Sequence, residues 1–127
     1  MSTPIPLAPA ILLVDDEPDV RIILRRVLLA IADGSDLIAL DNGAAALAML
    51  QSRMVPLVVT DLNMPGMNGL ALAEAVKAAS PSTTVVLITA YQLSDLARKS
   101  HTKAIDHYLP KPFPFDQLEA IVRKALP

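Results

Sequence analysis

Residues 10–16 read AILLVDD, a short apolar run that ends in two carboxylates. Three further apolar runs end in polar residues in the same way: LVVTD at 57–61, TVVLIT at 84–89 and YLPK at 108–111. Short, continuously apolar, β-branched runs are typical of strands that are buried on both faces. Longer segments of helical period lie between these runs, and the alternation predicts βαβ units around a parallel sheet.

The alternation predicts one α/β domain of the (βα)5 type, with helices on both faces of a five-stranded parallel sheet. The strands are expected at 10–14, 36–40, 57–60, 84–89 and 104–109. The helices are expected to begin at about residues 18, 43, 70, 94 and 114, and the middle three to end at about 52, 79 and 102. The domain is expected to cover residues 1–127, with its core at about 9–126 and a flexible tail at 1–8.

The segment after the first strand has the clearest helical pattern. Its apolar residues recur at three- and four-residue spacing and are expected to face the core: Val20, Ile23, Leu24, Val27, Leu28 and Ile31. Asp16 is expected to cap this helix with its side chain. Pro18 suits the first turn, where its missing N–H has no intrahelical partner.

Composition excludes several classes of protein. The chain has 127 residues, of which 53% are hydrophobic and 3% aromatic, so the core must be aliphatic. No apolar run approaches the roughly 18 residues of a spanning helix, and we expect no membrane insertion. A formal charge of −2 provides no electrostatic argument for nucleic-acid binding. The absence of cysteine excludes disulfides and thiolate sites, and it fits the expected cytoplasmic location.

Polar side chains follow four of the predicted strands at their carboxyl ends: Asp15, Asp16, Asp61, Thr89 and Lys111. Each alone could be a helix cap or a loop charge, but in an open α/β sheet these ends meet at one edge, where ligands bind. Two carboxylates about 4 Å apart repel by about 4 kcal/mol at an effective dielectric near 20, so the cluster should hold a proton or bind a cation. Oxygen ligands favour Mg²⁺, and a metal beside an ammonium suits phosphoryl transfer to a carboxylate.

Four motifs in this order resemble the receiver domain of two-component response regulators. They are Asp15-Asp16, TDLNMPGMNG at 60–69, ITAY at 88–91 and YLPKPF at 108–113. The resemblance covers nearly the whole chain. It implies a flavodoxin-like three-layer sandwich with strand order 2-1-3-4-5.

The resemblance also implies the roles of the acidic cluster. Asp61 is the expected phosphoacceptor, and Lys111 would pair first with Asp61 and then with a phosphoryl oxygen. Asp16, Asp61 and the backbone carbonyl of Asn63 would bind Mg²⁺, with Mn²⁺ as an alternative. Asp15 would act through a metal-bound water.

Further roles are implied for residues around the cluster. Thr89 and Tyr108 would be the switch residues that respond to phosphorylation. Asn63 and Tyr91 lie where the family controls water access and would tune hydrolysis, although Tyr91 fits an exposed loop aromatic equally well. The peptide bond between Lys111 and Pro112 is expected to be cis.

The implied function is that of a signalling domain rather than an enzyme. It would accept phosphate from a phosphohistidine of a histidine kinase or phosphotransfer protein. It would then bind a downstream protein through the fourth helix, fifth strand and fifth helix. The same residues suit a receiver that stands alone or one cut from a hybrid kinase or multidomain regulator.

Two alternative classes fit the sequence less well. A phosphatase of the haloacid dehalogenase type also uses Asp, Mg²⁺ and Lys, but it needs Asp-x-Asp-x-Thr after the first strand, and DDEPD at 15–19 does not match. A flavodoxin-like flavin binder needs a phosphate-binding loop at that place. The carboxylates of Asp15 and Asp16 would repel a phosphate there.

Overall fold

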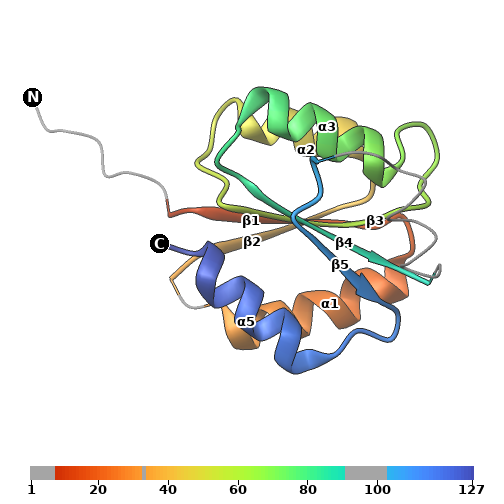
Figure 1. The fold of residues 1–127 in the computed structure, drawn as a ribbon, viewed down its shortest axis with the longest axis vertical. Coiled ribbons are helices and arrows are strands. Elements are labelled where there is room, and N and C mark those ends of the chain that lie inside the picture. Colours follow the sequence, from red (N-terminus) through yellow and green to blue (C-terminus); the bar gives the residue numbers. More distant parts are fainter. Residues whose placement is uncertain (1–7, 33, 91–102) are drawn as a thin grey trace, which may run out of the picture.

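The computed structural model describes residues 8–32, 34–90 and 103–127 and places a five-stranded parallel sheet between two layers of helices (Figure 1). The strands are β1 (Ala10–Val14), β2 (Asp36–Leu40), β3 (Leu57–Asp61), β4 (Thr84–Thr89) and β5 (His107–Pro110). The helices of the described ranges are α1 (Pro18–Ile31), α2 (Gly43–Leu50), α3 (Gly69–Ala79) and α5 (Phe115–Ala125). The helix expected at 94–102 lies outside the described residues. No helix in the described ranges is long and apolar enough to span a lipid bilayer.

The strand order is β2-β1-β3-β4-β5, which confirms the order that the resemblance to receiver domains implied. All neighbouring strands run parallel. In this order β1 and β3 are interior strands and β5 is an edge strand. The edge position explains why β5 tolerates Pro110, which has no N–H to donate to a further strand. Because the strands are parallel, their carboxyl ends all lie at one edge of the sheet.

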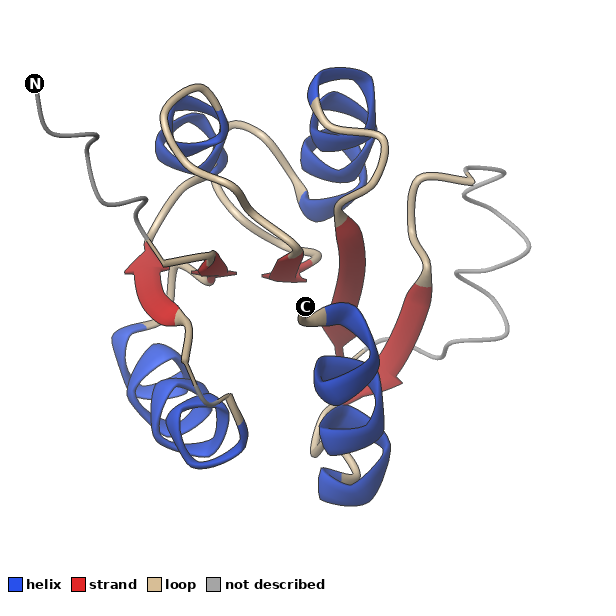
Figure 2. Ribbon diagram, turned by 90° about the vertical axis from the view of Figure 1, so that its left-hand side faces the viewer, coloured by secondary structure: helices blue, strands red, loops and turns tan. Residues whose placement is uncertain are grey.

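The core consists of two apolar clusters, one on each face of the sheet. Leu12 and Val14 of β1 pack on the side of α2 and α3, whereas Ile11 and Leu13 pack on the side of α1 and α5. Figure 2 shows the two pairs of helices on opposite sides of the sheet. All five residues of β1 are fully buried, which accounts for the continuous apolar run in the sequence.

Three element boundaries differ from the expected ones. Residues 51 and 52 leave α2, because the last N–H groups bond to carbonyls only three residues back, as in a tightened final turn. β3 continues to Asp61, which pairs with Ile88 of β4. β5 begins at His107 rather than at residue 104, since the ladder with β4 begins at His107.

The start of α1 corrects two expectations. The N-cap residue is Glu17, and it makes no side-chain cap, so Asp16 is not the cap of this helix. Instead the Glu17 N–H donates to Asp15 Oδ1 at 2.9 Å. Ile23 was expected to face the core but is 58% exposed, because the face of α1 that meets the sheet is narrower than the sequence pattern. Pro18 occupies the first turn as expected.

A network of polar contacts holds α3 against the amino-terminal ends of β4 and β5. Lys77 Nζ lies 2.6 Å from Asp106 Oδ2 and donates to the Thr83 carbonyl at 2.6 Å. The same Asp106 oxygen accepts the Val85 N–H at 2.8 Å. The Asp106 carboxylate is therefore directed toward α3 and β4.

Gly69 packs directly beneath the end of β3. A Cβ atom there would overlap the Asp61 carbonyl oxygen and come within 2.7 Å of Leu87 Cδ1. Gly43 occupies the equivalent position of α2, directly after an Asn whose side chain caps the helix. A Cβ on Gly43 would lie 3.1 Å from the flexible Met67 sulfur.

The close approach of Gly69 leads to a first prediction. Gly69→Ala should lower the free energy of unfolding by about 2 kcal/mol, because backbone atoms must shift to admit the methyl group. Gly43→Ala is the matched control and should change stability by less than about 1 kcal/mol, since Met67 can move. Urea unfolding measures both variants, and equal midpoints for the two would contradict the prediction.

Candidate functional site

The carboxyl edge of the sheet brings together side chains from three strand ends. Asp15 and Asp16 follow β1, Asp61 is the last residue of β3, and Lys111 follows β5. Val14 pairs with Thr60, so the carboxylates that follow the two central strands are neighbours. The parallel register thus positions side chains that are as many as 96 residues apart along the chain.

Three carboxylates form a tight cluster at this edge. Asp15, Asp16 and Asp61 each offer one oxygen, and these oxygens lie within 4.8 Å of one another. Asp15 is 1% exposed and Asp61 is 8% exposed, whereas Asp16 is half-buried. The two central carboxylates are therefore largely removed from water, and their mutual repulsion is poorly screened.

Lys111 supplies the counter-charge. Its Nζ lies 3.0 Å from Asp61 Oδ1 and 3.4 Å from Asp15 Oδ2. The backbone N–H of Lys111 donates to the Thr89 carbonyl at 2.9 Å, which holds the residue at the end of β4. The peptide bond between Lys111 and Pro112 is cis. Among the described residues, three carboxylates face this one ammonium, which leaves two formal negative charges in the cluster.

Burial and charge shift two pKa values in the cluster. Burial raises the pKa of Asp15, and the nearby charge of Asp61 adds to this effect, while the Glu17 N–H and Lys111 oppose it. Burial alone would lower the pKa of Lys111. The hydrogen bond to Asp61 and the charges of Asp15 and Asp61 outweigh burial, so this pKa is raised.

A hollow of about 300 Å³ opens beside the cluster. It is lined by Asp16, Asn63, Met64, Pro65 and Asn68. An octahedral Mg²⁺ keeps several waters, and the hollow offers room for them next to a carboxylate. The donor set consists of oxygens only, which fits a hard divalent cation.

The remaining expected site residues surround the cluster. Thr89 is buried as the last residue of β4, and Tyr108 is half-buried on β5, where it pairs with Leu87. Asn63 follows the end of β3 and lines the hollow with Asp16. Tyr91 lies outside the described residues.

Arg21 is a site residue that sequence reasoning missed. Its Nη1 donates to the Asp15 backbone carbonyl at 2.7 Å and so ties the first turn of α1 to the loop after β1. Arg21 is not part of the apolar stripe of α1, so the helical pattern gave it no role. The available signal was its position six residues after a strand-end carboxylate, within reach of a long side chain.

Comparisons with known proteins agree with this geometry. The family profile of the response regulator receiver domain matches residues 11–123. The transcriptional regulator NtrC of Escherichia coli is 35% identical over 113 residues, which is 89% of this chain and 24% of NtrC. The chain thus spans about a quarter of that relative. Sporulation initiation phosphotransferase F of Bacillus subtilis is 31% identical over 92% of this chain and 93% of that protein.

A solved structure shares both fold and sequence. The response regulator TrrA of Thermotoga maritima, in complex with Mg²⁺ and BeF, has a TM-score of 0.80. It is 35% identical and covers 93% of this chain and 99% of that one. The fold and the site define a signalling domain of the receiver class. The chain belongs to the response regulator receiver domain family.

The raised pKa of Asp15 leads to a second prediction. When a carboxylic acid has a higher pKa in the folded state than in the unfolded state, the folded protein loses stability as pH rises from the unfolded-state pKa to the folded-state pKa. In the absence of divalent ions at neutral pH, Asp15→Asn should therefore stabilise the protein by about 1 kcal/mol, a rise in Tm of about 3–5 °C. The gain should disappear as pH falls below about 3.9, where unfolded Asp is itself protonated. Thermal melts over this range, with Asp19→Asn on exposed α1 as control, measure the effect, and a gain that persists at low pH would contradict it.

Proposed function

We propose that this chain is a phosphoacceptor of a two-component phosphorelay, with Asp61 as the nucleophile. The observation that carries the proposal is the Asp61–Lys111 pair at 3.0 Å within a cluster that retains two negative charges. A largely buried carboxylate held by an ammonium is oriented for attack. Its site can also neutralise the charge of an incoming phosphoryl group.

Asp16, Asp61 and the backbone carbonyl of Asn63 would hold Mg²⁺, and Asp15 would act through a bound water. The oxygen donors, the excess negative charge and the adjoining hollow all support this assignment. TrrA, at 35% identity, is described in complex with Mg²⁺ and BeF. When bound, the ion supplies neutralisation of the phosphoryl oxygens.

In the transfer step, an Asp61 carboxylate oxygen forms a bond to phosphorus as the phosphorus–nitrogen bond of a phosphohistidine breaks. The electron pair of the broken bond stays on the donor imidazole. Lys111 moves from the carboxylate toward a phosphoryl oxygen and stabilises the charge that is spread over the transferred group. The product is an aspartyl phosphate on β3.

Phosphorylation adds about −1.5 to −2 charge and three acceptor oxygens. Thr89 and Lys111 would provide donors to this group, and Tyr108 would change its rotamer with them. Shifting a surface from an active-to-inactive ratio of 1:99 to one of 99:1 takes about 5.5 kcal/mol. A few charge-assisted hydrogen bonds of about 1.5–3 kcal/mol each supply that energy. The responding surface would consist of residues 94–102, β5 and α5, and it would bind a downstream protein.

The phosphodonor would dock on the side of α1 next to Lys111. Ile23 is 58% exposed there and lines an apolar hollow, and contiguous exposed apolar surface marks interaction sites. A wholly apolar hollow of about 210 Å³ lies between α1 and the chain after β5 and adjoins Lys111. An apolar helical surface of a histidine kinase or phosphotransfer protein fits this site, and it would present its histidine to the acidic cluster.

The acceptor assignment leads to a third prediction. Asp61→Asn should abolish labelling by acetyl phosphate in the presence of Mg²⁺, because an amide is not a nucleophile toward phosphorus. Intact-protein mass spectrometry detects the added phosphoryl group. Asp116→Asn, an exposed carboxylate on α5, is the control and should be labelled normally. Labelling of Asp61→Asn at the wild-type rate would refute the assignment.

The role of Lys111 leads to a fourth prediction. Lys111→Met should slow acetyl-phosphate labelling by about 10²-fold, since an electrostatic donor to the transferred group is lost. Affinity for Mg²⁺ should be unchanged or higher, because the variant removes a positive charge beside the metal ligands. The Mg²⁺ dependence of Tm measures that affinity. A parallel loss of metal binding and labelling would show that Lys111 acts only by holding the site together.

A further inference from the structure

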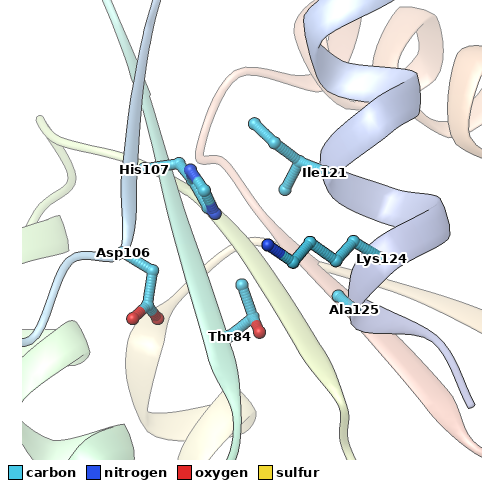
Figure 3. A pocket seen from close by; sticks show the side chains of 6 residues that line it. All are labelled: Thr84, Asp106, His107, Ile121, Lys124 and Ala125. Carbon is cyan, nitrogen blue, oxygen red and sulfur yellow. The ribbon is translucent and has the colours of Figure 1, made fainter.

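A further hollow, distinct from the two described above, lies at the opposite edge of the sheet. It is formed by the amino-terminal ends of β4 and β5 and the last turns of α5 (Figure 3). Its volume is about 200 Å³. It is lined by Thr84, Asp106, His107, Ile121, Lys124 and Ala125. Because β4 runs from Thr84 to Thr89, the hollow lies about 16 Å from the acidic cluster, too far to share a ligand with it.

Two nitrogen-bearing side chains point into this hollow from facing elements. Figure 3 shows the Lys124 ammonium reaching from α5 toward the strands and the His107 ring reaching from β5 into the same space. Thr84 lines the hollow beside them, with its methyl group toward the Lys124 ammonium. Within the described ranges, neither the Lys124 side chain nor the His107 side chain makes a hydrogen bond or ion pair. The hollow thus collects donors whose bonding capacity is unused.

The one carboxylate that lines the hollow does not neutralise it. The Asp106 oxygen Oδ2 is bound by Lys77 at 2.6 Å and by the Val85 N–H at 2.8 Å. Figure 3 shows this carboxylate on the far side of Thr84 from Lys124. On α5, Glu119 pairs with Arg123 at 3.3 Å. Among the described residues, no carboxylate pairs with Lys124, so its charge is available to a ligand.

The apolar wall strengthens any charge interaction in the hollow. Ile121 and Ala125 are half-buried and line the helix side, where they limit the access of water. An ammonium and an imidazole N–H that face one space match the acceptor oxygens of an oxyanion. A water molecule takes about 30 Å³ in the liquid, so a phosphate or carboxylate group fits here with part of its hydration shell.

We propose that this hollow binds a small oxyanion through Lys124 and His107, beside Thr84. The ligand is a phosphate or carboxylate group, either as the inorganic ion or as part of a small metabolite. Such an anion bridges α5 to the first residues of β4 and β5. Binding is independent of Asp61 and of divalent cations, because the hollow shares no residue with the acidic cluster.

NMR titration of the full chain with inorganic phosphate, in the presence of a chelator, tests the proposal. The amide signals of residues 84, 107 and 124 should shift saturably with a dissociation constant of about 1 mM or tighter. Asp61→Asn should bind equally well. A parallel titration with acetate distinguishes a carboxylate ligand from a phosphate. Sodium chloride at matched ionic strength should cause no saturable shift, and the same response to chloride and phosphate would overturn the proposal.

Two neighbouring residues of α5 provide matched variants. Both Lys124 and Arg123 are exposed cations, but only Lys124 lines the hollow. Lys124→Met should weaken phosphate binding at least about tenfold, the loss expected for one charge-assisted hydrogen bond. Arg123→Met should change it by less than about twofold, since screening weakens charges outside the contact. Equal weakening by both variants would show a response to net charge alone and would overturn the proposal.

Discussion

The balance between three carboxylates and one ammonium at the end of the sheet is the constraint on which the site depends. Asp15 and Asp61 are almost fully buried, and in the part of the chain that the structure describes Lys111 is their only counter-charge. Burial raises the pKa of Asp15, so the cluster costs stability when no cation is bound. Under the proposed function, a divalent cation would relieve the repulsion among these carboxylates and so stabilise the folded protein.

The parallel sheet is what makes this balance achievable. Each strand end delivers its polar residue to the same edge, and the buried strands behind it keep water away from the carboxylates. Gly69 tightens the arrangement, because α3 begins almost in contact with the Asp61 carbonyl. Arg21 fastens the other central loop through the Asp15 carbonyl. The side chains of the cluster are therefore held by backbone contacts on two sides, which limits the reorganisation needed for transfer.

Patterns of residues predicted the elements well where the signal was local. Continuous apolar runs located all five strands, and Asn42 and Asn68 preceded the starts of α2 and α3. The predictions failed where contacts with a neighbouring element determine which residues are buried or where a helix begins. Ile23 fits the helical period of α1, yet it faces outward, because the contact with the sheet covers only part of that stripe. Asp16 has a side chain suited to capping a helix, but the N-cap position of α1 is the next residue, Glu17.

The sequence by itself determined the fold class, the strand-end residues and the family, because these depend on local period and on motifs in a fixed order. Only the tertiary structure decided which atoms meet: the 3.0 Å pair of Lys111 with Asp61, the bond from Arg21 to Asp15 and the turning of Asp106 toward α3. It also revealed the hollow that Lys124 and His107 line, whose residues belong to no common sequence motif. The physical reason is that distances between segments far apart in the chain follow from strand register and helix packing, which no local pattern encodes.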